Sequence, residues 1–402
     1  MEYYRYSTWI KYLCDNIVAF SFIFFKIWYN GLERSEIMSL KAGIVGLPNV
    51  GKSTLFNAIT KKNILAANYP FATIDPNVGV VTVPDKRLEF LENLYLPERV
   101  VPTTYEFTDI AGLVKGASQG EGLGNKFLSH IREVDAIVEV VRCFENSDII
   151  HVENSVDPIR DIEIINVELM LADLEVIDGR IGRVEKKAKA KEKDYIKEYE
   201  LLVKIKEALE KNIPVRRLEL DDEEKLLLKS FALITAKPII YMANVSEEDV
   251  VAGGNKYTDM VKGYAEAEGA DTVVVCAKIE SELSELEESD KLEFLKDLGI
   301  KESGLDKLIK STYRLLGLAT YFTAGSDECR AWTFKVGMKA PECAGIIHTD
   351  FEKGFIKAEI MSYNDLEYLG SEKAVKEAGR LRLEGKEYVM QDGDICHFRF
   401  NV

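Results

Sequence analysis

One stretch, residues 46–54, constrains the fold more than any other part of the chain. It reads Gly-Leu-Pro-Asn-Val-Gly-Lys-Ser-Thr and matches the phosphate-binding pattern G-x-x-x-x-G-K-[ST] in full. A short apolar run, 40–45, precedes it, and a helix start, 54–59, follows it. The motif requires this context, because the loop amides and the helix N-terminus together bind phosphate. The stretch therefore predicts a nucleotide site within an α/β sheet.

We expect this phosphate loop to supply most of the contacts with the nucleotide. The Lys52 ammonium would reach the β- and γ-phosphates, and the Ser53 hydroxyl would bind Mg²⁺. Since an ammonium there stabilises a largely electrostatic transition state, Lys52 is also a candidate catalytic residue. The other nucleotide-binding candidates of the loop are Asn49, Val50, Gly51 and Thr54.

Two later segments are expected to act as switches around the γ-phosphate. The loop 61–77 lacks regular periodicity, and Thr73 within it is the candidate to close over Mg²⁺; an ordinary surface loop is the alternative. A predicted strand ends at Asp109, which suits an outer-sphere contact with Mg²⁺, and the Gly112 amide suits the γ-phosphate. The glycine-rich stretch 113–124 predicts a flexible second switch.

Two further strand tips are where a doubly wound sheet would hold the nucleotide base. Their candidate residues are Asn244, Val245, Glu247, Cys276 and Ala277. Guanine-specific relatives use Asn-Lys-x-Asp at the first tip, but here the lysine is absent and a longer Glu replaces the Asp. A bidentate contact with guanine is then out of register, whereas Asn244 and nearby backbone groups can meet adenine. The sequence thus predicts ATP over GTP.

The segment 164–235 interrupts this pattern with a helical period. Apolar spacings of three, four and seven predict two antiparallel helices packed as a hairpin. Its predicted tip carries seven basic residues: Arg180, Arg183, Lys186, Lys187, Lys189, Lys191 and Lys193. Because the whole chain has a net charge of −16, only such a local cluster could bind nucleic acid, and a solvated helix surface remains the alternative.

The ends of the chain differ in character from the middle. Residues 319–402 predict a compact β/α module that shows no catalytic cluster, which favours a binding role. Residues 1–37 are aromatic-rich, and their apolar stretch 17–25 is too short to span a bilayer. Two interpretations of these residues are open. They are a segment that associates with membranes, or they are a non-native or disordered extension that precedes a natural start at Met38. We favour the second, and expect no membrane binding, because a phosphate-binding strand usually opens such a domain.

Composition narrows the class further. A chain with 47% hydrophobic and 30% charged residues is typical of a soluble globular protein. Its six cysteines are scattered without a C-x-x-C pair, which argues against zinc and a disulfide framework and fits a reducing cytosol.

Several blocks together resemble the Obg-like ATPase (YchF) subgroup of translation-associated P-loop NTPases, over about residues 38–402. The blocks are Gly-Leu-Pro-Asn-Val-Gly-Lys-Ser, Asn-Tyr-Pro-Phe-Ala-Thr-Ile-Asp-Pro-Asn, Asp-Ile-Ala-Gly-Leu-Val-Lys-Gly-Ala-Ser, Asn-Val-Ser-Glu, and Tyr-Phe-Thr-Ala-Gly followed by Arg-Ala-Trp-Thr. The resemblance implies a Ras-like, OBG-type G domain over 38–163 and 236–318, interrupted by a helical coiled coil at 164–235. A ubiquitin-like β-grasp TGS domain would follow at 319–402.

The resemblance also implies a function. It implies hydrolysis of ATP to ADP, association with ribosomes or ribosomal RNA through the hairpin and the TGS domain, a cytoplasmic location, and roles in translation and stress response. A conventional GTPase of the same fold and an RNA-binding regulator with incidental turnover remain alternatives. A small-molecule kinase is a weaker one, since no separate acceptor pocket is indicated.

The resemblance bears on how water is activated. Ras-like enzymes orient the attacking water with a Gln where this chain has Leu113, which cannot hydrogen-bond. His151 matches the histidine proposed as catalytic in the family, and an imidazole suits the task; a loop histidine that merely contacts solvent is the alternative. Asn49 is the residue type that coordinates K⁺ in relatives, so K⁺ joins Mg²⁺ as a candidate cofactor.

Overall fold

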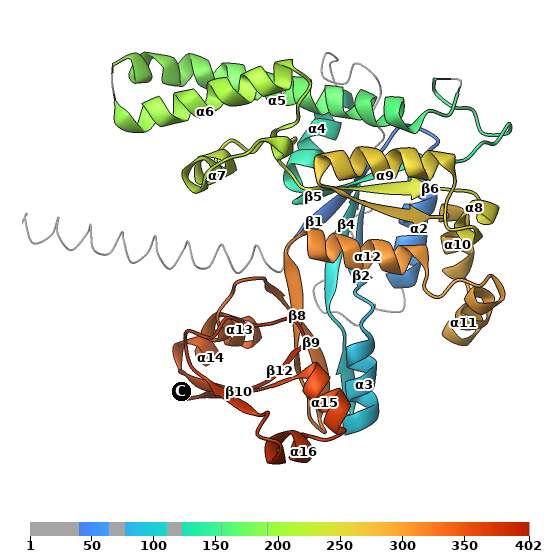
Figure 1. Cartoon of the computed structure of the whole chain (residues 1–402), viewed down its shortest axis with the longest axis vertical. Coiled ribbons are helices and arrows are strands. Elements are labelled where there is room, and N and C mark those ends of the chain that lie inside the picture. The colour runs from blue at the N-terminus through green and yellow to red at the C-terminus, as the bar shows by residue number, and fades with distance from the viewer. Residues whose placement is uncertain (1–39, 64–76, 111–122, 154, 191, 402) are drawn as a thin grey trace, which may run out of the picture.

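The computed structural model describes residues 40–63, 77–110, 123–153, 155–190 and 192–401. Two six-stranded sheets organise these residues. The first sheet lies in the upper part of Figure 1, and the second lies below it, near the C-terminus. A long pair of helices, α5 and α6, projects to one side of the upper part.

The first sheet has the strand order β2-β4-β1-β5-β6-β7, in which all pairs are parallel except β2 with β4. The strands are β1 (Lys41–Val45), β2 (Val78–Thr82), β4 (Thr104–Asp109), β5 (Ala136–Arg142), β6 (Ile239–Asn244) and β7 (Asp271–Val275). Every residue of β5 and β6 is buried, because helices cover both faces; α9 and α12 lie on opposite sides in Figure 1.

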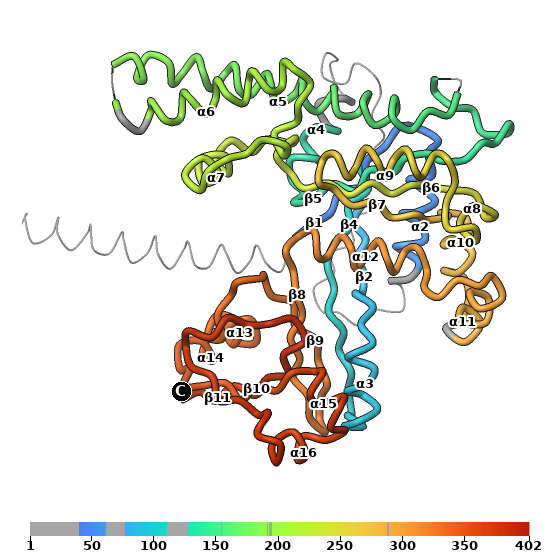
Figure 2. The backbone as a smooth tube through the Cα atoms, viewed as in Figure 1, coloured from blue at the N-terminus to red at the C-terminus, as the bar shows by residue number. Residues whose placement is uncertain are grey.

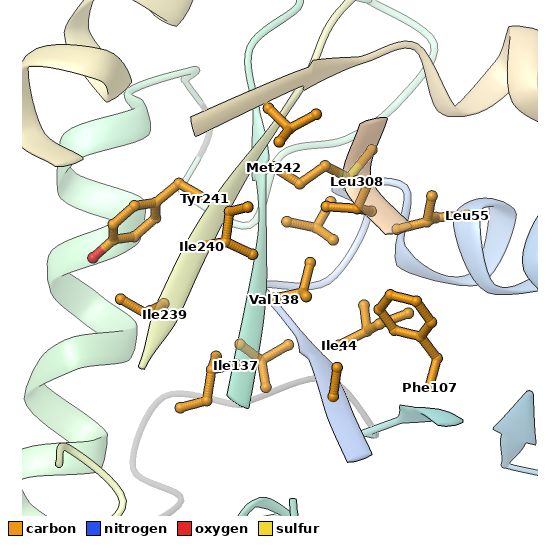
Figure 3. Packing of buried hydrophobic residues seen from close by; sticks show 14 of the residues in the cluster. Ile44, Leu55, Phe107, Ile137, Val138, Ile239, Ile240, Tyr241, Met242 and Leu308 are labelled. Carbon is orange, nitrogen blue, oxygen red and sulfur yellow. The ribbon is translucent and has the colours of Figure 1, made fainter. Parts of the chain in front are cut away.

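The helices of this half alternate with the strands, as a parallel sheet requires. They are α2 (Lys52–Asn63), α4 (Leu123–Glu133), α5 (Pro158–Lys189), α6 (Lys193–Glu210), α7 (Asp222–Lys229), α8 (Glu247–Val251), α9 (Lys256–Glu268), α10 (Ala277–Leu283), α11 (Glu288–Asp297) and α12 (Gly304–Leu315). Figure 3 shows the core between them, where Ile44 and Val138 of adjacent strands lie near Leu55 of α2 and Leu308 of α12.

The helical hairpin is rooted inside the main core. The predicted boundary at residue 164 falls within α5, whose buried residues Ile162 and Leu169 belong to the core of the first sheet. Farther along α5, Asp173 accepts hydrogen bonds from the backbone N–H groups of Ile234 and Thr235, at 2.9 and 2.7 Å. This buried carboxylate ties the returning chain to the outgoing helix, so the hairpin and the sheet share one continuous element.

The second sheet has the order β11-β10-β12-β8-β9-β3. Its strands are β8 (Leu318–Thr323), β9 (Glu328–Lys335), β10 (Phe355–Ser362), β11 (Arg382–Glu384), β12 (Asp394–Phe400) and β3 (Arg99–Val101), and its helices are α13 (Ala340–Ile347), α14 (Thr349–Lys353), α15 (Tyr363–Leu369) and α16 (Glu372–Glu377). The β8–β9 hairpin, the helix α13 and the parallel β8–β12 pair form the expected β-grasp arrangement, which confirms the fold class.

One segment of the predicted G domain belongs with the C-terminal sheet in the structure. Residues 84–103 belong to the range 38–163, but α3 (Lys86–Tyr95) and β3 join the C-terminal sheet instead. β3 pairs with β9 in parallel, and Leu91 of α3 packs in the same buried cluster as Phe322. Figure 2 shows α3 alongside the C-terminal strands. A strand as short as Arg-Val-Val carries too little periodicity to reveal a partner more than 200 residues away in sequence.

Candidate nucleotide-binding site

The phosphate loop connects the end of β1 to the start of α2, as expected. Its glycines are required by geometry, because Gly46 and Gly51 have φ angles of 153° and 103°. A Cβ atom at Gly51 would lie 2.3 Å from the side-chain nitrogen of Asn244. Asn49, at φ 63°, adopts the left-handed conformation that asparagine tolerates best among larger residues. The loop therefore keeps its backbone close to the neighbouring strand tips.

Lys52 is buried beneath this loop. Its Nζ atom donates to the carbonyl oxygens of Gly46 at 2.8 Å and Leu47 at 2.6 Å. Burial lowers the pKa of Lys52 to about 8, and the carboxylate of Asp109 opposes that shift. Burial likewise raises the pKa of Asp109, against the attraction of Lys52. Both pKa shifts disfavour the charged forms of Lys52 and Asp109, because the cost of desolvation exceeds their mutual attraction. An anionic phosphate bound nearby would favour the charged ammonium of Lys52 again.

The residues around the loop fit a magnesium ion that the nucleotide helps to bind. Ser53 is exposed in the first turn of α2, directly after Lys52, and Asp109 ends β4, where its charge interacts with Lys52. In the described ranges no group of three or more His, Cys, Asp or Glu side chains could hold a metal by itself. Phosphate oxygens and water would have to supply the remaining ligands, as Mg²⁺ sites usually require. Thr73, Gly112 and Leu113 lie outside the described residues.

Asn244 joins the phosphate loop to the second strand tip. Its Nδ2 atom donates to the carbonyl oxygen of Val50 at 2.8 Å, and its Oδ1 atom accepts from the Ala277 N–H at 3.0 Å. Val245 and Cys276 are buried beside it, so they support the site from behind. Because the protein uses both ends of the Asn244 amide, its second N–H hydrogen is the donor left for a base.

Glu247 lies at the edge of the same site and has a partner that the sequence analysis missed. Its carboxylate forms an ion pair with Lys278 Nζ at 2.8 Å, which bridges the tips of β6 and β7. The hydrogen bond with Glu247 raises the pKa of Lys278. The glutamate that replaces the guanine-binding aspartate is therefore partly neutralised by a lysine of α10, the helix that follows β7.

His151 is buried, with an exposed fraction of 7%, which rules out the solvent-facing alternative in this conformation. Its Nε2 atom lies 2.8 Å from Asp161 Oδ2, and its Nδ1 atom accepts from the Glu153 N–H at 3.1 Å. Because a backbone N–H can donate only to an unprotonated Nδ1, this geometry directs the Nε2 hydrogen towards Asp161. Both nitrogens are engaged within the protein, so His151 can contact water only by exchanging one of these partners.

The loop that carries His151 also touches the phosphate loop. The side-chain nitrogen of Asn49 donates to the carbonyl oxygen of Ile150 at 3.2 Å. The remaining Asn49 oxygen is the kind of donor that K⁺ accepts. Two residues that organise this region, Arg142 and Asp161, were not singled out by the sequence analysis. Arg142 carried one signal, a charged residue at the end of an otherwise apolar strand.

The basic tip of the hairpin is partly neutralised by its own side chains. Arg180 pairs with Glu198 at 2.6 Å, Lys189 pairs with Glu185 at 2.6 Å, and Lys187 donates to the Tyr195 hydroxyl at 2.9 Å. Four members of the predicted cluster are exposed, namely Arg183, Lys186, Lys187 and Lys189. Lys191 lies outside the described residues, as does the side chain of Lys193. Ion pairs therefore offset two of the described positive charges, those of Arg180 and Lys189.

The chain is similar to several known proteins. Residues 41–172 match a family model described as "50S ribosome-binding GTPase". Residues 318–401 match the model YchF-GTPase_C, described as "Protein of unknown function (DUF933)". The "Ribosome-binding ATPase YchF" of Bacillus subtilis is 63% identical over 366 residues, which cover 91% of this chain and 100% of that protein.

Two more distant relatives extend this similarity. The "Obg-like ATPase 1" of Caenorhabditis elegans is 46% identical over 367 residues, which cover 90% of this chain and 93% of the relative. The solved structure of the Schizosaccharomyces pombe YchF GTPase superposes with a TM-score of 0.81 at 44% identity, over 90% of this chain and 98% of the other.

Proposed function

Because this chain belongs to the YchF family of Obg-like ATPases, we propose that it is a cytoplasmic, ribosome-binding enzyme that hydrolyses ATP to ADP and phosphate. The observation that carries the proposal is the buried Lys52 ammonium, which donates to two carbonyl groups of the phosphate loop and lies near Asp109. A lysine desolvated in this way gains most from an anionic ligand, which favours a bound triphosphate over an uncharged molecule.

Each side chain of the site has a defined task in this proposal. Lys52 exchanges its carbonyl partners for the β- and γ-phosphates, and the loop amides around Gly51 orient them. Ser53 and Thr73 would hold the magnesium ion, with Asp109 in its outer sphere. Magnesium, when bound, would neutralise charge that develops on the phosphates. Asn49 would hold K⁺ through its side-chain oxygen.

The activation of water is assigned to His151. Leu113 provides no hydrogen bond, so a polar group from another segment has to orient the water, and the His151 loop is the one that contacts Asn49 of the phosphate loop. In this role the imidazole would leave Asp161 and present Nε2–H or Nδ1 to the water.

ATP is the proposed substrate, and GTP is the second candidate. The names of the relatives are divided, since those of Bacillus and Caenorhabditis are called ATPases, whereas the Schizosaccharomyces structure is described as a GTPase. The ion pair between Glu247 and Lys278 favours ATP. A carboxylate already shared with a lysine, and displaced by one methylene, is poorly suited to accept both N–H donors of guanine.

The ribosome is the proposed partner, through the hairpin and the C-terminal TGS domain. The relatives named ribosome-binding ATPases support this partner. Arg183 and Lys186 on the hairpin are exposed basic groups that suit RNA phosphates. The three parts would then divide the work, with turnover in the G domain and binding in the hairpin and the TGS domain.

Ribosome co-sedimentation tests the coupling between turnover and binding. The protein is pelleted with 70S ribosomes in the presence of ATP, ADP or no nucleotide. A switch predicts that the bound fraction differs between ATP and ADP, and that the ribosome changes the rate of ATP hydrolysis. Equal pelleting in all three conditions, with no effect on turnover, would instead indicate a passive RNA binder.

A further inference from the structure

The His151 loop, residues 143–153, contains an internal anchor. We propose that Arg142, the last residue of β5, is the positioning residue that sets the shape of this loop and so controls where His151 can act. The inference rests on the proposed role of His151. It goes further by naming Arg142 as the side chain that connects the His151 loop to the sheet.

The contacts of Arg142 are concentrated on one short segment. Its guanidinium donates from Nε to the Phe144 carbonyl at 3.2 Å, from Nη1 to the Ile149 carbonyl at 3.1 Å, and from Nη2 to the Asn146 carbonyl at 3.2 Å. It also stacks over the Phe144 ring, 4.7 Å from the centroid. One side chain thus binds three carbonyl groups spread over six residues of the loop.

Burial makes this arrangement rigid. The exposed fraction of Arg142 is 1%, so water does not replace the loop carbonyls around it. A guanidinium has five N–H donors in a fixed plane, and the spacing of the three acceptors must match that plane. Arg142 reaches its three carbonyl groups from three separate nitrogens, whereas a lysine would have to present all of its donors from a single atom. The loop conformation is therefore specified by arginine, and a positive charge alone would not specify it.

The loop is held from several directions, since Asn255 also donates to the Cys143 carbonyl at 2.7 Å and the Tyr257 hydroxyl donates to Glu145. Arg142 holds it from the sheet, and Asn49 of the phosphate loop contacts it at Ile150. His151 follows Ile150 directly and is held in turn by Asp161. Burial lowers the pKa of Arg142, and the negative charge of Asp161 opposes that shift, so the anchor and the acceptor of the imidazole also interact electrostatically. Replacing Arg142 should therefore affect His151 in two ways, through the conformation of the loop and through the interaction with Asp161.

The test uses Arg142→Lys in the full chain, with Arg216→Lys as the matched control. Arg216 is another buried arginine, paired with Glu268 at 3.1 Å at the root of the hairpin, and it does not donate to the His151 loop. Hydrogen exchange of the backbone amides in 145–153 is followed by mass spectrometry. We expect exchange at least about tenfold faster in Arg142→Lys and parental exchange of this segment in Arg216→Lys.

Kinetics then separate positioning from general destabilisation. A positioning role predicts that Arg142→Lys lowers kcat for ATP at least about tenfold while KM stays within about twofold of the parent. Combining it with His151→Ala should give no further loss beyond His151→Ala alone, because both act through the same group. If Arg142→Lys does not fold, Arg142→Gln replaces it, since a neutral amide leaves no unpaired buried charge.

The outcomes distinguish this inference from the function on which it rests. Unchanged exchange of 145–153 in Arg142→Lys overturns the anchoring role, whatever the kinetics show. Faster exchange combined with additive kinetic losses overturns the route through His151. If His151→Ala alone hydrolyses ATP at the parental rate, the proposed function of His151 fails, and faster exchange still supports Arg142 as the anchor of the loop.

Discussion

The imidazole of His151 donates from Nε2 to Oδ2 of Asp161 across 2.8 Å, and both side chains are buried. A histidine held in this way has both ring nitrogens engaged, because its second nitrogen accepts from a backbone N–H. If it orients water, its contact with Asp161 or with the Glu153 N–H must open during each turnover. The rate of ATP hydrolysis should then depend on this residue while nucleotide binding should not.

Replacing His151 by alanine tests that dependence. We expect His151→Ala to lower ATP turnover at least about tenfold, which is roughly 1.4 kcal/mol of transition-state stabilisation, with ATP affinity unchanged. Leu113→Ala is the control and should have a much smaller effect, since leucine offers no hydrogen bond. Turnover is compared in KCl and NaCl. A parental rate for His151→Ala, with and without ribosomes, would mean that His151 does not activate water. K⁺ or the substrate phosphate would then have to supply that function.

Gly51 tests the packing of the phosphate loop against Asn244. A methyl group at Gly51 would lie 2.3 Å from the Asn244 amide, at a φ angle of 103° that other residues rarely adopt. We expect Gly51→Ala to abolish ATP binding in a calorimetric titration. Gly182→Ala on α5 is the matched control, because it meets no atom within 4 Å, and it should keep ATP affinity and raise stability by about 0.5–1 kcal/mol. Normal affinity in Gly51→Ala would show that the loop has more space than this geometry indicates.

The pH dependence of ATP binding tests the burial of Lys52. Its pKa of about 8 in the free protein means that the ammonium loses its proton as the pH rises through that value. Phosphate binding favours the charged form, so binding above pH 8 takes up a proton, and affinity falls as the pH rises. We expect the Kd for ATP to increase about tenfold between pH 7 and pH 9. Calorimetry in buffers of different ionisation enthalpy measures the proton uptake directly, and a flat profile would contradict the assignment.

The exposed basic groups of the hairpin should contribute to ribosome binding. Arg183→Glu combined with Lys186→Glu is expected to weaken co-sedimentation and to reduce its dependence on salt, because fewer phosphates are neutralised. ATP turnover without ribosomes should stay at the parental value. Lys211→Glu, at the far end of α6, serves as the charge control. Equal losses in the control and the double variant would mean that overall charge matters and that this surface does not.

The sequence alone predicts those elements of the fold that depend on local motifs and periodicity. The phosphate loop, its flanking strand and helix, and the two antiparallel hairpin helices all follow from motif and periodicity within short windows. The parallel direction of most strands follows from their alternation with helices. The β-grasp arrangement, in contrast, was implied only by family resemblance, because its strands are short and lack a motif of their own.

The residues that the sequence could not reveal act across long separations. Asp161 meets His151 because α5 begins beside the loop after β5, and no spacing rule gives that angle. α3 and β3 lie on the C-terminal sheet because their apolar side chains find their partners there. The second contact of Asn244, with the Ala277 N–H, likewise depends on how two neighbouring strands end together. Such contacts follow from tertiary packing, which overrides local preference.

The most direct test of the account is steady-state hydrolysis of ATP and GTP side by side, by the parent, Lys52→Ala and Ser53→Ala. Loss of the phosphate-bound ammonium or of the hydroxyl that would bind magnesium removes about 3 kcal/mol or more of transition-state stabilisation, so both variants should lose activity at least about a hundredfold. The parent should prefer ATP, since an unpaired guanine donor disfavours GTP by about 1–3 kcal/mol. Turnover of both variants within about threefold of the parent, or GTP hydrolysis equal to or faster than ATP hydrolysis, would contradict the account.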